Sequence, residues 1–119
     1  MVIDALDAIV DDLRRHVGDS LVALDIWESE SALSLAGFGA TTATGPMLHR
    51  MTEDLRNAAS LAGASLDDYH VLTVAGGIIA VVSGPYLSAA LLMTDDAEPA
   101  WVLTSVVPAV RAALDTASA

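Results

Sequence analysis

The residues best suited to metal binding or acid–base chemistry are the histidines and the paired acids. His49 and Glu53 are spaced one helical turn apart, the minimum geometry for two metal ligands on one helix face. A third ligand would have to come from His70 or from the pair Asp67-Asp68, and no spacing fixes either of them. A solvated helix face explains the same residues, so we expect no metal and no cofactor.

Covalent catalysis lacks a recognisable arrangement of residues. The chain has no Cys, which excludes thiol chemistry and disulfides, and it has no Gly-x-Ser-x-Gly motif. The paired acids Glu28 and Glu30 flank a strand, where charge ordinarily serves solubility. The stretch 39–45, GATTATG, lacks the Gly-Lys-Ser/Thr ending of a phosphate loop, and the chain has no Lys. We expect a helix-entry loop there and a protein that is not an enzyme.

Charge restricts the partners that the surface can attract. The net charge is −11, with 16 acidic residues against five arginines. Nucleic acid and anionic membrane surfaces repel such a protein, which leaves a protein partner or self-association. The opening MVIDALDAIVDD carries acids where a secretion signal needs basic residues, so we expect a cytoplasmic protein. Residues 1–119 are expected to form a single domain.

The stretch 69–94 contains no Asp, Glu, Lys or Arg and is cut by Gly76-Gly77 and Ser83-Gly84-Pro85. These turn signals leave pieces far too short for a transmembrane helix, which is the rival interpretation. We predict a three-stranded antiparallel meander with strands Tyr69–Ala75, Ile78–Ser83 and Tyr86–Thr94. Both faces of these strands are apolar, so helices from elsewhere in the chain should cover both.

The rest of the chain supplies those helices and two more strands. Helical spacing of apolar residues predicts helices over Met1–Val17, ending at Gly18, over Pro46–Gly63, and over Asp96–Ala117. Asp96 should cap the last helix, and Pro108 should bend or split it. A hairpin is predicted from Leu21–Trp27 and Ala32–Phe38, joined around Glu28-Ser29-Glu30, with the second run as an edge strand.

This order predicts an α+β fold, a three-layer α/β/α sandwich around a five-stranded antiparallel sheet. The first and third helices should cover one face, and the second helix the other. On the second helix we expect an apolar stripe of Leu48, Met51, Leu55, Ala58 and Ala62, opposite a polar side with His49, Arg50, Glu53, Asp54, Arg56 and Asn57.

The run Tyr69–Val74 has no Lys, Pro or bulge, the features that usually protect an exposed edge strand. At an edge, its free N–H and C=O groups would pair with a second copy of the chain. The predicted dimer interface is Tyr69, His70, Val71, Leu72, Thr73 and Val74. The alternative is that this strand lies inside the sheet and the monomer is closed.

The sequence resembles the roadblock domain of dynein light chains and its bacterial relatives. The segments that carry the resemblance are IDALDAIVDDLRRHVGDS, LVALDIWESESALSLAGF, MLHRMTEDLRNAASLAGA and YHVLTVAGGIIAVVSGPYLSAALLMTD. The hairpin turn Glu-Ser-Glu departs from the Asp-Gly type common in relatives, which leaves the local turn type open.

The resemblance implies a non-catalytic homodimer with one continuous sheet across a two-fold axis. Roadblock relatives bind Ras-like small GTPases through the surface around the second helices, and a bacterial motility member accelerates GTP hydrolysis by its partner. By position, the partner-binding residues expected here are Arg50, Glu53, Asp54 and Asn57. The alternative is a small-molecule-sensing module of the profilin or GAF type, although the core offers few polar groups to hold a ligand.

Overall fold

The computed structural model describes residues 3–39 and 44–118. The first half of the chain contains helix α1 (Ile3–Val17), a short 3-10 turn (Gly18–Ser20), strands β1 (Leu21–Glu28) and β2 (Ser34–Phe38), and helix α2 (Thr44–Leu61). The second half contains strands β3 (Tyr69–Val74), β4 (Gly77–Ser83) and β5 (Leu87–Thr94), a short helix α3 (Pro99–Trp101), a π-helical segment (Val102–Val106) and helix α4 (Val107–Ser118).

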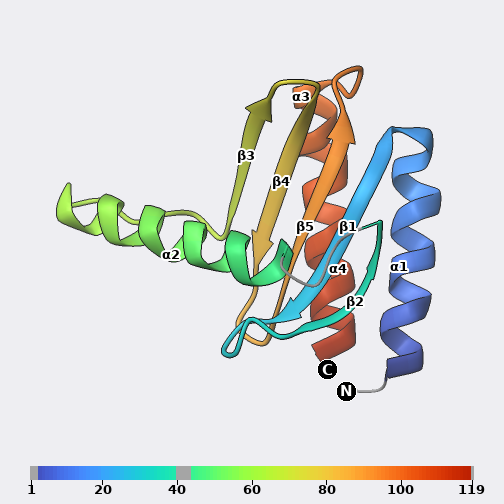
Figure 1. Cartoon of the computed structure of the whole chain (residues 1–119), viewed down its shortest axis with the longest axis horizontal. Helices are drawn as coiled ribbons and strands as arrows, with labels where there is room; N and C mark the ends of the chain where they lie inside the picture. Colours follow the sequence, from blue (N-terminus) through green and yellow to red (C-terminus); the bar gives the residue numbers. More distant parts are fainter. Residues whose placement is uncertain (1–2, 40–43, 119) are drawn as a thin grey trace.

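The described strands form one antiparallel five-stranded sheet in the order β2-β1-β5-β4-β3. Helices α1 and α4 pack together on one face, and α2 lies across the other (Figure 1). The predicted α+β sandwich is therefore confirmed. Both predicted edges are also present, since β2 and β3 are the outer strands.

The main core lies between the sheet and the pair α1 and α4. Alternate residues of the central strands point to this face, for example Ala80, which pairs with Leu91. They meet apolar side chains spaced three or four residues apart on the helices, as expected for amphipathic packing. The fully buried members include Leu6, Leu24, Ile26, Ala80, Leu91, Met93, Val102, Val106 and Val110.

The opposite face is covered only in part, which the sequence did not predict. A small cluster of Trp27, Val81 and Ala90 is buried there, with Leu48 of α2 packed against it. Figure 1 shows α2 running across the strands and then continuing past the β3 edge of the sheet. The expectation that the chain's own helices cover both faces is therefore wrong for the outer part of this face.

The strand ends at the turns differ from the prediction by one or two residues. β1 continues through Glu28, and β2 begins at Ser34 rather than Ala32, because Ala32 adopts a left-handed conformation (φ 61°) that interrupts the strand. In the β3–β4 turn only Gly76 has a positive φ (84°), and Gly77 already belongs to β4.

Helix α2 begins at Thr44, two residues before the predicted start at Pro46. Most of the predicted 39–45 loop, residues 40–43, lies outside the described residues. Helix α2 ends at Leu61, two residues before the predicted end, and Gly63 (φ 77°) stops it: the N–H of Ala64 donates to the carbonyl of Ala59, and the N–H of Gly63 to that of Ser60. This is the hydrogen-bond pattern of a Schellman motif.

The C-terminal helical region departs from a single helix over Asp96–Ala117. Helix α3 starts at Pro99 with Glu98 in the cap position, because the Asp96 carboxylate accepts a hydrogen bond from Thr94 and does not cap the helix. The predicted disturbance at Pro108 is confirmed, with a π-helical segment just before it. Pro108 has no N–H to donate, so the backbone bonds rearrange in the preceding turn.

Candidate interaction surface

The free edge of β3 presents backbone groups that have no strand to pair with in the described part of the chain. The N–H of Ser83 donates to the carbonyl of Asp68 (2.6 Å). Asp68 and Ser83 are therefore a hydrogen-bonded pair at the start of the β3–β4 ladder. Hydrogen-bonded pairs alternate along an antiparallel ladder, so His70, Leu72 and Val74 direct their backbone groups to β4. The N–H and C=O groups of Tyr69, Val71 and Thr73 therefore point away from the sheet. This is the edge for which self-pairing was predicted.

Helix α2 is rotated relative to the prediction. Its most buried side chain is Thr52, 4% exposed, whose hydroxyl donates to the carbonyl of Leu48 (2.9 Å). Arg56, expected on the polar side, is half-buried, and Leu55 of the predicted apolar stripe is exposed. The predicted stripe is therefore right for Leu48, which packs against the sheet, and wrong for Leu55.

Both ends of α2 leave large apolar side chains in contact with water. Met47 is 70% exposed and Leu61 is 93% exposed, at opposite ends of the helix. Val22 on β1 and Val74 on the edge strand β3 are exposed as well. Exposed apolar area of this extent, next to a free sheet edge, is typical of a protein–protein contact.

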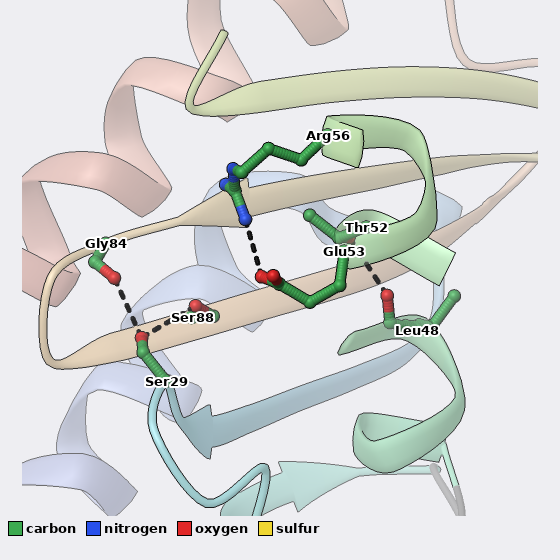
Figure 2. A network of polar contacts seen from close by, with 7 residues as sticks. All are labelled: Ser29, Leu48, Thr52, Glu53, Arg56, Gly84 and Ser88. Atoms are coloured by element: carbon green, nitrogen blue, oxygen red, sulfur yellow. Dashed lines mark hydrogen bonds and ion pairs between the residues drawn. The ribbon is translucent and has the colours of Figure 1, made fainter. Parts of the chain in front are cut away.

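The four residues predicted to bind a partner, Arg50, Glu53, Asp54 and Asn57, all lie on α2 and are exposed. Glu53 accepts a hydrogen bond from the Arg56 guanidinium (2.6 Å), and their side chains lie over the strands in Figure 2. Within residues 3–39 and 44–118, no group of three His, Asp or Glu side chains could hold a metal ion.

A buried acid that sequence analysis missed lies beneath the start of α2. Asp25 on β1 is 2% exposed, and its Oδ1 accepts a hydrogen bond from the Ser34 hydroxyl on the neighbouring strand. Burial raises the pKa of the Asp25 carboxyl above its usual 3.8, while the Ser34 hydroxyl and the backbone N–H of Gly45 act to lower it. Both partners are distant in sequence, so no local pattern signals this contact.

His70 lies on β3 with its side chain toward the α2 face. Neither ring nitrogen has a hydrogen-bond partner among the described residues. Burial lowers the pKa of His70 below its usual 6.5, and the positive charge of Arg56 lowers it further. The neutral imidazole is therefore favoured at this edge of the sheet.

An apolar groove of about 350 Å³ lies between the start of α2 and the sheet. It is lined mostly by aliphatic side chains, among them Met47, Leu48, Ile79 and Leu92. Among its described lining residues the one charged group is Asp25, which already contacts Ser34. This lining lacks the convergent polar groups that a small-molecule sensor uses to orient a ligand.

None of the described helices is long and apolar enough to cross a bilayer. The segment 69–94, for which a transmembrane helix was the rival interpretation, contains strands β3, β4 and β5.

The fold is shared with solved roadblock structures. MglB from Myxococcus xanthus superposes with a TM-score of 0.76 at 12% identity, covering 95% of this chain and 84% of that chain. A gliding protein, MglB from Thermus thermophilus, gives 0.72 at 13% identity, covering 93% and 84%. A Roadblock/LC7 domain from Streptomyces avermitilis gives 0.67 at 13% identity, covering 95% and 98%. By sequence, the chain matches no family model and no curated protein. The resemblance to the roadblock domain is thus confirmed at the level of the fold.

Proposed function

From this roadblock fold, we propose that the chain is a non-catalytic regulatory protein of the cytoplasm that forms a homodimer and docks a Ras-like small GTPase. In this proposal residues 1–119 act as one roadblock-like domain. The interface runs along Tyr69–Val74, and the partner contacts the α2 surface.

The observation that carries the homodimer is the unpaired β3 edge beside an overhanging helix. Three outward-facing residues, Tyr69, Val71 and Thr73, offer backbone donors and acceptors to a further strand. A second β3 placed there would extend the sheet beneath the part of α2 that projects past the edge (Figure 1). It would cover apolar side chains such as Leu55 that this copy leaves in water. One contact would thus pair the free backbone groups of β3 and cover exposed apolar side chains of α2.

The GTPase follows from the resemblance, which implies a Ras-like partner at the second helix. Here that helix carries Arg50 and Arg56, two of five arginines in a chain of net charge −11. A mixed-charge surface with exposed apolar side chains suits a reversible protein contact. The name of the Thermus relative, a gliding protein, is compatible with a regulatory role in motility or a similar process.

The homodimer is tested by light scattering with a matched pair of variants. The wild-type protein is expected to have twice the monomer mass at micromolar concentration. Thr73→Pro removes one outward N–H, whereas the β3–β4 ladder, bonded through His70, Leu72 and Val74, stays intact. Thr73→Ala removes the same exposed side chain but keeps the N–H. We expect Thr73→Pro to be monomeric and Thr73→Ala dimeric; a monomeric wild-type protein would overturn the proposal.

The docking step is tested separately, by asking whether a small GTPase from the same cell co-purifies with the tagged chain and binds it in a nucleotide-dependent manner. Binding to the GTP-bound form and not to the GDP-bound form is the expected result. If the dimer binds no GTPase in either nucleotide state, the homodimer proposal still stands and the proposal of a GTPase partner is wrong.

A further inference from the structure

The side chains on the α2 face of the sheet form two rows that run across the strands. The pairing of β1, β5, β4 and β3 places one residue of each strand in each row. The first row is Asp25, Ala90, Val81 and His70, and the second row is Ala23, Leu92, Ile79 and Leu72. Members of the two rows on one strand are two positions apart, so the rows are about 7 Å apart.

Helix α2 lies on the first row and leaves the second row open. The first turn and Leu48 of the helix pack on the first row, where Asp25, Val81 and Ala90 are at most 4% exposed. Every member of the second row is partly exposed. The apolar groove of about 350 Å³ lies along this second row, beside the start of α2.

The edge pairing proposed above joins the first row of one copy to the second row of the other. In a symmetric dimer Val71 lies opposite its own copy, because only that register pairs the outward backbone groups of Tyr69, Val71 and Thr73. His70 then lies opposite Leu72 of the second copy. A helix that follows the first row of its own sheet therefore continues along the second row of the other sheet.

Helix α2 is long enough to reach that row. Its 18 residues span about 25 Å. The helix starts over β1, and β3 lies three strands further on, a distance of about 14 Å. Figure 1 shows the helix running across the strands and past β3. About 11 Å of helix remains beyond that edge, which is enough to cover two strands of a second copy.

One side of α2 carries apolar side chains along its whole length. Leu48, Leu55 and Ala62 are seven residues apart, so they share this side of the helix. Leu48 packs on its own sheet, whereas Leu55 is 37% exposed. Ala62 is exposed as well, and its N–H continues the helical pattern by donating to the carbonyl of Ala58 (3.2 Å). The stripe is thus covered at the start of α2 and bare at the far end.

The geometry points to the apolar groove as the binding site for the α2 helix of a second copy. Each α2 would cross the two-fold axis and lay Leu55 and Ala62 along the second row of the other copy, whose helix would do the same in return. The two antiparallel helices would lie on adjacent rows, close to the separation of about 8–10 Å between packed helices. This inference rests on the proposed homodimer, and it assigns the groove to the chain itself. Arg50, Asp54 and Asn57 lie on the side of the helix away from the sheet and stay available to a GTPase.

A matched pair of variants tests the inference through the dissociation constant of the dimer, measured by sedimentation equilibrium. Ala62→Glu places a carboxylate on the side of α2 that would meet the second copy. Leu61→Glu places the same charge on the next residue, which is 93% exposed and lies about two and a half helical turns from the buried Thr52, so it points away from the sheet. We expect Ala62→Glu to raise the dissociation constant by about tenfold or more and Leu61→Glu by less than about twofold, because only the first carboxylate is buried in the dimer.

A second measurement detects the contact between copies directly. An unlabelled Leu61→Cys chain carrying a nitroxide is mixed with a ¹³C-methyl-labelled wild-type chain, so that only a neighbour in another copy can broaden a signal. We expect broadening of the Ile79 methyl signal in the groove, and none for Ile9, which is buried on α1 at the other face of the sheet. A dimer in which the two glutamate variants behave alike, or in which Ile79 keeps its signal, would overturn this inference and leave the homodimer standing. A monomeric wild-type protein would overturn both.

Discussion

The carboxylate of Asp25 lies so close to Gly45 that a Cβ on residue 45 would stand 2.7 Å from Asp25 Oδ2. This contact joins the centre of the sheet to the first turn of α2, where the helix dipole favours negative charge. It brings the carboxylate against a helix that has few buried residues of its own, Gly45 and Thr52 being those of its described residues that are buried. The position of α2 on the sheet therefore depends on a buried acid and a glycine.

Gly45→Ala should destabilise the protein, although Gly→Ala inside a helix ordinarily stabilises it by about 0.5–1 kcal/mol. The new methyl group would overlap Asp25 Oδ2 and press on Trp27, and we expect a loss of about 1–3 kcal/mol in the free energy of unfolding. Urea denaturation measures it. The double variant Gly45→Ala/Asp25→Ala, compared with Asp25→Ala, should lose much less, because the overlap is gone. An additive double variant would show that the two residues do not interact.

His70 should make stability depend on pH in the mildly acidic range. Its pKa in the folded state is lowered, so the unfolded chain takes up a proton first as the pH falls below the usual value of 6.5. The stability that neutral His70 contributes is complete above that pH and is lost as the pH falls through the folded-state pKa. His70→Gln cannot titrate and should flatten the curve of unfolding free energy between about pH 7.5 and pH 5. Identical pH dependence in the two proteins would contradict the burial of the imidazole.

Arg50→Glu should weaken binding of a GTPase by about tenfold without unfolding the chain, because an exposed charge at a contact mainly affects association. Arg15→Glu on α1 makes the same change in net charge far from α2 and serves as the control. Surface plasmon resonance at two salt concentrations separates the local contact from long-range attraction. Equal loss in both variants would mean that overall charge, and not the α2 surface, governs binding.

Much of the fold could be predicted because local signals agree with it. The uncharged stretch 69–94, divided by Gly76-Gly77 and Ser83-Gly84-Pro85, does contain three strands, and Gly18 and Gly63 end helices with positive φ as expected. Element boundaries were less accurate where a side chain found a tertiary or neighbouring partner. Asp96, bonded to Thr94, is one example, since its chemistry fits a helix cap equally well.

The interaction surface could be predicted only in part. The run Tyr69–Val74 lacked edge protection and does lie at an edge. The orientation of α2 was predicted wrongly because apolar periodicity places Leu55 on the buried side, whereas Leu55 is exposed. Thr52 is buried although it is polar, because its hydroxyl donates to the carbonyl of Leu48 in the same helix. A pattern of apolar residues does not predict such a position. Asp25 was missed because its partners Ser34 and Gly45 are remote in the chain.

The geometry of the free edge also fixes the register of a symmetric dimer. Three residues, Tyr69, Val71 and Thr73, face outward, and a two-fold axis pairs all of them only when Val71 lies opposite its own copy. Tyr69 then lies opposite Thr73 of the other copy. Facing residues in a hydrogen-bonded antiparallel pair have Cα atoms about 5.5 Å apart, within the range of a disulfide. Two copies of residue 73 would be about 13 Å apart along the strands.

Single-cysteine cross-linking therefore tests the edge-paired dimer most directly, since the chain has no cysteine of its own. Val71→Cys and Thr73→Cys would be oxidised under mild conditions and compared on a non-reducing gel. The account predicts a covalent dimer from Val71→Cys and a monomer band from Thr73→Cys. Cross-linking of neither variant, or equal cross-linking of both, would contradict pairing of β3 with its own copy about Val71.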